Sequence, residues 1–414
     1  MQRLPPELKG IVVDCLRDDR KALLACAATS NDWVALSRSA LFSSQGRFES
    51  IPSGDPRIIN QRSIQAFVRL LKSPDCTLIS TVHCLYLEDP SEGSTVVSDE
   101  LPALARLRSV QRLSFKSTDF GRLSSRAWRV LTSHFANTVR DLRLDFILFE
   151  NSVWQISDLV QPFRSLETLS MLHATSRVTP HKRPSSPALH TVNIYGDVTS
   201  DVLHWLEILS APRLHTITFT ATPLSRVFPF LKRLPLSLTR LDVLNGIMGR
   251  AKSEVSMRDL DLSCHQNLRV LDIGDFTLGA ADRALRLIIA THAGGDVHFI
   301  PSILARVASS HLEEVRFGLI PGKRPRNGDP PPDFIWNDND EDHTADEIND
   351  ILACPQFAKL KAVVVRVPHA TPERIEYIRQ RLPDCRDREI LRVEEIGRRE
   401  DFPRMAFVIR RSLL

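Results

Sequence analysis

Two short stretches, Leu238-Thr239-Arg240-Leu241-Asp242-Val243 and Leu268-Arg269-Val270-Leu271-Asp272-Ile273, share one pattern of apolar positions. An apolar residue is followed by two variable residues, a second apolar residue, one variable residue and a third apolar residue. Eight further copies keep this spacing: Val82/Leu85/Leu87, Val110/Leu113/Phe115, Val139/Leu142/Leu144, Leu166/Leu169/Met171, Leu189/Val192/Ile194, Leu214/Ile217/Phe219, Leu312/Val315/Phe317 and Leu360/Val363/Val365. A chain with 43% hydrophobic residues gives two or three such matches by chance, and ten in sequence indicate a repeat.

The copies recur with a loose period. Between Val82 and Leu268, neighbouring copies begin 28, 29, 27, 23, 25, 24 and 30 residues apart. A period of about 20–29 residues with this apolar core is typical of a leucine-rich repeat. The last two apolar residues alternate as in a strand, and one such unit buries its apolar face only by stacking on its neighbours.

Helix-length apolar periodicity separates the strand signatures, at 101–107, 128–135, 202–209 and 285–289. We therefore predict an α/β fold, a curved solenoid with parallel strands on its concave face and helices on its convex face, joined by right-handed crossovers. Regular leucine-rich repeats carry an asparagine three residues after the last strand leucine. No asparagine ladder exists here, because those positions hold Pro90, Thr118, Ile147, Ala174, Asp197, Thr222, Gly246 and Phe276.

Bulk composition narrows the function classes. The 414 residues include 54 basic and 50 acidic side chains, a balance that disfavours a dedicated nucleic-acid binder. Seven cysteines, none spaced C-x-x-C, suggest a reducing compartment and neither a disulfide frame nor a zinc site. The first residues have no apolar run, and no stretch of about 18 apolar residues occurs. We expect a protein inside the cell, cytoplasmic or nuclear.

The first 45 residues predict a small helical unit. Pro5 and Pro6 precede a helical pattern with Leu8, Val12 and Leu16 on one face, and a second helix follows from about Lys21. A unit of this size builds little core alone, so its apolar faces need a neighbour. Either they only cap the first repeat or part of the surface receives a partner.

At this point the chain resembles a known family. Leu4-Pro5-Pro6-Glu7-Leu8, an aspartate pair, Leu23-Leu24-Ala25-Cys26, Trp33, Ser37-Arg38 and Leu41-Phe42-Ser43 resemble the F-box motif in its fungal form, over residues 3–45. Leucine-rich repeats are a common companion of that motif. The one departure lies before the tryptophan, where Thr29-Ser30-Asn31 stands in place of the usual Val-[Ser/Cys]-Arg.

The resemblance implies a substrate adaptor of an SCF-type (Skp-cullin-F-box) ubiquitin ligase. The F-box would bind a Skp-type adaptor, and through it cullin, while the repeats hold an unknown target protein. The positions that fold the motif or meet the adaptor would be Leu4, Pro5, Leu8, Val12, Val13, Leu16, Leu24, Cys26 and Trp33. The alternative is a freestanding repeat scaffold or inhibitor whose N-terminal helices only cap the solenoid.

The remaining chain divides into four parts. Residues 46–77 form a turn-rich linker and a first capping helix around Ile64–Leu71, and residues 78–320 hold most of the repeats. Residues 321–345 are proline-rich and acidic, and are expected to form a disordered insertion loop. Residues 346–414 complete the last repeat and the C-terminal cap, with closing strands predicted at 390–393 and 405–409.

The sequence contains no strong candidate for a catalytic, metal-binding or cofactor-binding motif. Asp338, Asp340 and Asp342 have the spacing of a calcium loop, but the required glycine and glutamate are His343 and Asn349. Lys323-Arg324-Pro325-Arg326 is a short basic run of the kind common in surface loops. His190 and His215 occupy the same place in two repeats, which indicates repeat homology and not a metal pair. Nucleotide-binding and hydrolase motifs are absent from the sequence, so we expect no catalytic residue, metal or cofactor.

The residues that alternate with buried ones in each strand are expected to line the concave face and contact a protein target. They form a polar wall with arginine and tyrosine, which are enriched in interface hot spots. Acidic residues on the same wall argue against nucleic acid. The candidates are Arg112, Lys116, Arg143, Asn193, Tyr195, Thr218, Arg240, Asp242 and Arg316.

Overall fold

The structure of the 414-residue chain is a computed structural model. It describes residues 4–16, 19–42, 61–73, 76, 78–80, 82–89, 96–149, 156–174, 188–196, 198, 200–208, 211, 213–220, 227, 230–232, 237–244, 261–278, 299–321, 344–367 and 370–395. The helical pattern at 285–289, the basic run at 323–326, the aspartates at 338–342 and the closing strand at 405–409 lie outside these residues.

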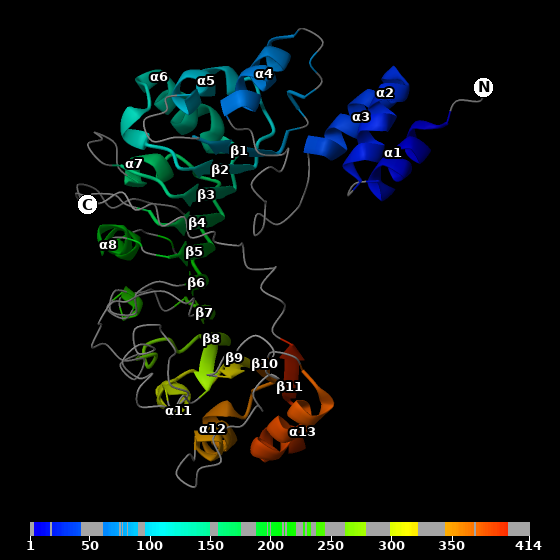
Figure 1. Cartoon of the computed structure of the whole chain (residues 1–414). Helices are drawn as coiled ribbons and strands as arrows, with labels where there is room; N and C mark the ends of the chain where they lie inside the picture. Colours follow the sequence, from blue (N-terminus) through cyan, green and yellow to red (C-terminus); the bar gives the residue numbers. More distant parts are fainter. Residues whose placement is uncertain are drawn as a thin grey trace, which may run out of the picture. The chain divides into compact units, whose positions relative to one another are not determined.

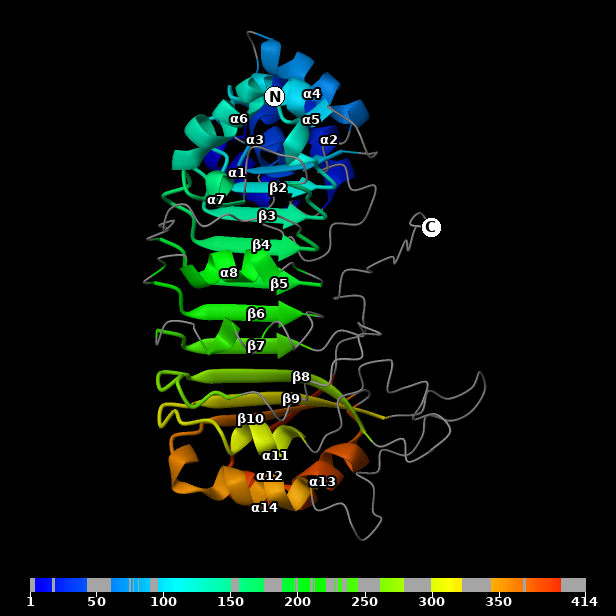
Figure 2. The same cartoon turned by 90° about the vertical axis from the view of Figure 1, so that its left-hand side faces the viewer.

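A single sheet holds eleven strands whose order in the sheet follows their order in the chain (Figures 1 and 2). The eight neighbouring pairs whose register is described are all parallel. Each of the ten repeat signatures supplies one strand, and β11 overlaps the closing strand predicted at 390–393 but ends two residues later. The strands are β1 Cys84–Glu88, β2 Arg112–Lys116, β3 Asp141–Asp145, β4 Thr168–Leu172, β5 Thr191–Tyr195, β6 Thr216–Thr220, β7 Arg240–Leu244, β8 Val270–Leu278, β9 Glu314–Pro321, β10 Ala362–Val367 and β11 Leu391–Glu395. The predicted parallel-strand repeat is therefore confirmed.

Described helices follow each of the first ten strands except β4, β6 and β7. Helices α5 to α7 lie against one face of strands β1 to β3, and α8 and α11 lie against one face of strands β5 to β9 (Figures 1 and 2). The helices are α1 Pro6–Cys15, α2 Arg20–Thr29, α3 Asn31–Phe42, α4 Gln61–Lys72, α5 Val96–Leu104, α6 Ser125–Arg129, α7 Ile156–Val160, α8 Ser200–Ile208, α11 Phe299–Leu304, α12 Thr344–Ala353, α13 Pro372–Arg381 and α14 Pro383–Asp387. Of these, none is long and apolar enough to cross a lipid bilayer. The helix predicted at 128–135 is broken: α6 ends at Arg129 and a π-helical turn, Val130–His134, follows.

Two compact units make up the chain. Unit 1 comprises Met1–Leu169, Ala174–Thr179 and Arg399–Leu414, and unit 2 comprises Ser170–His173 and Pro180–Arg398. Around the predicted insertion loop 321–345, strand β9 extends to Pro321 and α12 begins at Thr344, so the rest of that segment lies outside the described residues.

The core consists of the repeat signature itself. All thirty apolar positions of the ten copies are buried, and the most accessible of them, Leu360, is 4% exposed. Phenylalanines from the connecting segments fill the space behind the strands; in unit 1, Phe120 stacks on Phe149 and meets Phe115 edge to face. This burial explains why the spacing of the apolar residues is kept although the repeat length varies.

A ladder of backbone carbonyl groups joins the repeats where the strands begin. The carbonyl oxygen of His83 accepts hydrogen bonds from the N–H groups of both Gln111 and Arg112, and the carbonyl of Gln111 accepts from Arg140 and Asp141 in turn. In unit 2 the same double acceptance runs through the carbonyls of His190, His215, Thr239, Arg269 and Glu313. Within each unit the main chain thus bonds these neighbouring repeats to one another.

A second regularity lies where the strands end. Ser117, Phe146 and His173 follow three successive strands at the same place, and each adopts a left-handed backbone with φ of 54°, 53° and 50°. The N–H of Ser117 donates to the carbonyl of Asp145, and that of His173 donates to the carbonyl of Tyr195. Backbone hydrogen bonds thus also join neighbouring repeats at these two strand ends.

Helices α1, α2 and α3 pack on one another around a small core. Val13, Leu23 and Ala40 are its buried residues, and Leu16, Trp33 and Leu36 pack partly against them. The Lys9 ammonium group pairs with Asp32 at 2.9 Å, which ties α1 to α3. The Asp19 side chain accepts a hydrogen bond from the N–H of Ala22 and so caps α2.

Candidate functional surfaces

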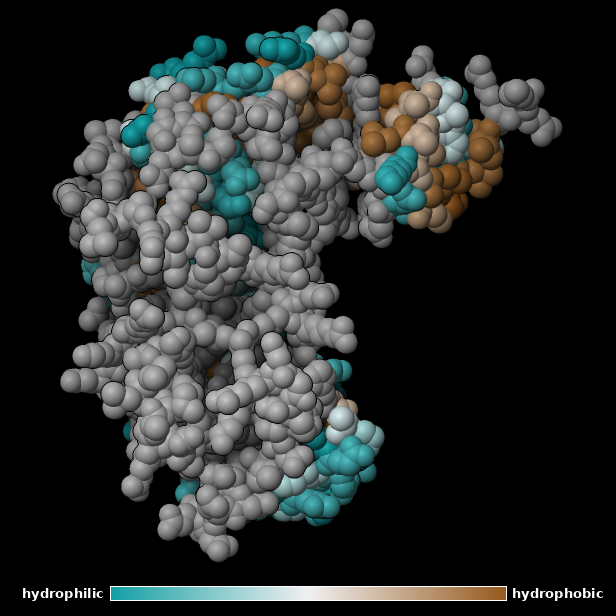
Figure 3. Space-filling view, in the orientation of Figure 1, coloured by the Kyte–Doolittle hydropathy of each residue, from teal (hydrophilic) through white to brown (hydrophobic). Residues whose placement is uncertain are grey.

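Exposed apolar side chains gather on α1 and α2. Five of the eight large hydrophobic residues that are exposed among the described residues belong to the first 24 positions. They are Leu4, Leu8, Ile11, Val12 and Leu24, between 38% and 58% exposed, and we call them the apolar stripe. Figure 3 shows hydrophobic surface over these helices. On α1 the spacing 8, 11, 12 places three of them on one helical face, opposite the buried Val13, and Leu4 lies just before the helix begins.

The predicted adaptor-binding residues divide by exposure. Leu4, Pro5, Leu8, Val12 and Leu24 are exposed, while Leu16, Cys26 and Trp33 are half-buried. Val13 is buried in the core of the three helices, so it supports the stripe from beneath and does not contact a partner directly.

Sequence reasoning missed Ile11, which is the most exposed member of the stripe. Its position three residues after Leu8 was the available signal, because residues at that spacing share a helical face.

The polar face of the sheet consists of the strand residues that alternate with the repeat signature. Strand register places the predicted target-binding residues on this face: Arg112 is opposite Asp141, Asn193 is opposite Thr218, and Thr218 is opposite Asp242. Ser114 shares the face yet is buried, so alternation along a strand does not by itself make a side chain accessible.

In unit 1 the charged groups of the polar face pair with one another. Lys116 lies 2.8 Å from Glu88, Arg112 lies 3.8 Å from Asp141, and the Nε of Arg143 lies 2.8 Å from Asp145. Burial raises the pKa of the Asp141 carboxyl, and the nearby Arg112 opposes that rise. Burial, reinforced by Asp145, likewise raises the pKa of the Tyr86 phenol far above its usual range, so this tyrosine stays neutral.

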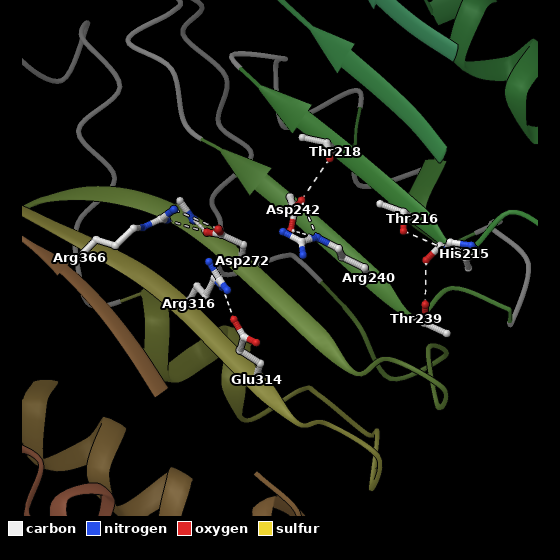
Figure 4. Close-up of polar contacts among 11 residues, drawn as sticks. His215, Thr216, Thr218, Thr239, Arg240, Asp242, Asp272, Glu314, Arg316 and Arg366 are labelled. Atoms are coloured by element: carbon white, nitrogen blue, oxygen red, sulfur yellow. Dashed lines mark hydrogen bonds and ion pairs between the residues drawn. The ribbon is translucent and has the colours of Figure 1, made fainter. Parts of the chain in front are cut away.

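In unit 2 the same arrangement recurs on β7 (Figure 4). The Nε of Arg240 donates to both carboxylate oxygens of Asp242, at 3.1 and 3.0 Å, and the Thr218 hydroxyl donates to Asp242 at 3.2 Å. Burial raises the pKa of Asp242, whereas the hydrogen bond from Arg240 lowers it. Three groups on two neighbouring strands therefore form one closed cluster.

Two further ion pairs continue the polar face toward β10. Arg316 pairs with Glu314 on its own strand, and Arg366 reaches Asp272 with both terminal nitrogens, at 2.7 and 3.1 Å (Figure 4). Three ion pairs within single strands could have been predicted from the sequence: Arg143/Asp145, Arg240/Asp242 and Glu314/Arg316. Opposite charges two residues apart on a strand lie on one face and are neighbours there.

The part of the polar face on β4, β5 and β6 is different in kind. Its side chains are hydroxyls, an amide and a phenol, and the Asn193 amide donates to the Ser170 hydroxyl at 3.1 Å. Tyr195 and Thr191 flank Asn193 on β5 and are half-buried.

The two histidines singled out from sequence lie side by side. The rings of His190 and His215 stack with centroids 5.5 Å apart and planes 16° apart, one residue ahead of β5 and β6. Within the described ranges, no group of three or more His, Cys, Asp or Glu side chains could hold a metal ion. The stacking agrees with equivalent positions in neighbouring repeats.

Comparison with known proteins gives low-identity structural matches. No protein-family model and no curated protein matches the chain. Among solved structures, a Bacteroides fragilis protein shares 12% identity at a TM-score of 0.35, covering 61% of this chain and 63% of its own. A leucine-rich-repeat protein of Leptospira interrogans shares 12% identity at a TM-score of 0.23, covering 71% of this chain and 74% of its own. The chain thus spans less than two thirds of the length of the Bacteroides protein.

Proposed function

We propose that the protein is a substrate adaptor of an SCF-type ubiquitin ligase. In this proposal the apolar stripe of α1 and α2 binds a Skp-type adaptor, and the polar face of the repeats binds the target protein. The observation that carries it is the apolar stripe. The core of the three helices buries only Val13, Leu23 and Ala40, whereas five large apolar side chains remain exposed. Scattered surface leucines are ordinary, whereas a contiguous apolar patch marks an interaction site.

The stripe has the chemistry that the F-box resemblance requires. Each of the five side chains is about half exposed, so covering one contributes about 1 kcal/mol and covering all five contributes about 5 kcal/mol of gross free energy to a complex. Val13 and the Lys9–Asp32 pair fix α1 against α3, which presents the stripe on a pre-formed surface. A pre-formed surface loses little conformational entropy on binding.

The adaptor would act by proximity and would contribute no catalytic group. Holding the target and the charged ubiquitin-conjugating enzyme on one scaffold raises their effective concentration, while the reacting cysteines belong to other subunits. Such a role places the protein inside the cell, in the cytoplasm or nucleus. The repeats then serve as a protein-interaction scaffold, which is the general use of an extended strand face.

The test is co-purification of the full-length chain with a Skp-type adaptor and cullin. Leu8→Asp combined with Ile11→Asp is expected to abolish recovery of both proteins, while the circular dichroism of the chain is unchanged. Leu70→Asp is the matched control, since Leu70 is an exposed leucine on α4 and lies outside the stripe.

Two outcomes would contradict the proposal. One is that the wild-type chain recovers no Skp-type adaptor. The other is that the double variant melts as a whole, which would assign the stripe to capping of the repeats and favour a freestanding scaffold.

A further inference from the structure

The polar face of unit 2 has an uncharged centre. It consists of Ser170 on β4, Thr191, Asn193 and Tyr195 on β5, and Thr216 and Thr218 on β6. Register places Thr191 opposite Thr216 and Asn193 opposite Thr218, so these side chains form two adjoining rows. Across the polar-face positions of β4 to β6 whose side chains the structure describes, no charged residue occurs.

Strands β7 to β10 of the same unit carry charge on this face, but that charge is balanced within the chain. Arg240, Arg316 and Arg366 pair with Asp242, Glu314 and Asp272 respectively. Three cations and three carboxylates leave no net charge in this group. An incoming charged side chain would have to displace one of these partners and leave another charge unpaired and partly buried, which is costly.

We infer that the uncharged centre binds a polypeptide segment that has no net charge, through hydrogen bonds to the hydroxyls and the amide. This inference rests on the proposed function, because it specifies the target that the repeats hold. Hydroxyl and amide groups both donate and accept, as the backbone and neutral side chains of a peptide do. Tyr195 adds an aromatic ring of the kind enriched at protein interfaces.

The closing experiment selects peptides on the full-length purified chain. The probe is a phage-displayed library of random dodecapeptides, with no Skp-type adaptor in the assay. Enriched peptides are expected to have net charge near zero. Their Kd is expected to change less than about two-fold between low and high salt, because contacts without charge are not screened.

Substitutions at Thr191 distinguish a site that binds uncharged peptides from a site that binds charged ones. Thr191→Asp and Thr191→Arg are both expected to weaken peptide binding by about ten-fold or more, because either charge would enter the interface unpaired. Gln356→Asp and Gln356→Arg are the matched controls at an exposed position away from the sheet, and should leave Kd unchanged. Thermal melting of the four variants checks that the fold is intact.

Three results would overturn the inference. They are enrichment of acidic or basic peptides with a steep salt dependence, opposite effects of the two Thr191 substitutions, or no enriched peptide at all. Because the assay contains no adaptor, loss of Skp binding in co-purification leaves this result unaffected, and the two failures can be told apart.

Discussion

Arg366 on β10 reaches across β9 to Asp272 on β8, 94 residues earlier in the chain, and donates two hydrogen bonds to its carboxylate. The residue opposite Arg366 on the intervening strand is Gly318, which offers no side chain at the crossing point. The Asp272 side chain is only 6% exposed, and it also accepts a hydrogen bond from the N–H of Gly274 at 3.0 Å. One arginine thus ties three repeats of unit 2 together.

Removing Arg366 should destabilise unit 2. Arg366→Ala leaves Asp272 charged and buried, so the free energy of unfolding is expected to fall by about 2–4 kcal/mol in urea denaturation. Arg379→Ala is the control, because Arg379 forms an exposed pair at 3.9 Å with Glu376 and should change stability by less than about 0.5 kcal/mol. The double variant Asp272→Asn with Arg366→Ala should recover part of the loss. An equal loss in the single and double variants would argue against the ion pair as the cause.

Gly196 is expected to resist substitution. Its φ is +70°, and a Cβ atom there would lie 2.6 Å from the ring of His173 in the preceding repeat. Gly196→Ala should therefore lower the melting temperature, with a loss of about 2 kcal/mol from the left-handed backbone and the clash together. Adding His173→Ala removes the clash and should return the loss to about 1 kcal/mol. No recovery in the double variant would mean that the ring moves aside freely.

His265 is expected to make stability depend on pH. It is fully buried where other repeats have Phe163 or Phe357, and its Nε2 donates to the carbonyl of Leu231 at 3.1 Å. Its Nδ1 has no hydrogen-bond partner among the described residues. Burial lowers the pKa of His265, because the charged imidazolium would lose its hydration there.

Because the pKa of His265 is lower in the folded state, the unfolded state binds the proton first as the pH falls. The unfolded histidine titrates near about pH 6.5, so its stabilising contribution is complete above that pH. As the pH falls further, the unfolded chain is protonated before the folded one, and stability falls by up to about 1.4 kcal/mol per pH unit until the folded pKa is reached. Urea denaturation between pH 8 and pH 5 should show this decline in the wild type and a smaller one in His265→Phe. Parallel curves would contradict it.

On the N-terminal helices, substitutions in the core should affect folding, whereas substitutions in the apolar stripe should not. Val13→Asp places an unpaired charge in the small core and is expected to cost about 3 kcal/mol or more, with loss of amide protection in α1 to α3 in hydrogen exchange. Leu24→Asp changes an exposed side chain and should alter stability by less than about 0.5 kcal/mol. Unfolding of α1 to α3 by Leu24→Asp would show that Leu24 packs within this unit.

The candidate surfaces could be predicted only in part from the sequence. The face on which Arg240 and Asp242 lie follows from period-two alternation, and their spacing indicates a pair. Ser114 obeys the same alternation and is nevertheless buried, because burial on a sheet face depends on the side chains of neighbouring strands. The spacing of Ile11 from Leu8 places both on one face of α1, but whether that face is exposed depends on how α1 packs against α3, which the sequence of α1 does not specify.

The sequence by itself determined the ten repeat strands, the thirty buried positions and the face on which each strand residue lies. These are local consequences of apolar spacing and backbone geometry. Only the tertiary structure decided which charges meet, as Arg366 and Asp272 do across Gly318, and how the repeats stack through backbone carbonyls without asparagines. The physical reason is that strand register and hydrogen-bond partners depend on how strands far apart in the sequence align in the sheet. The connecting segments differ in length, so the sequence alone does not determine this alignment.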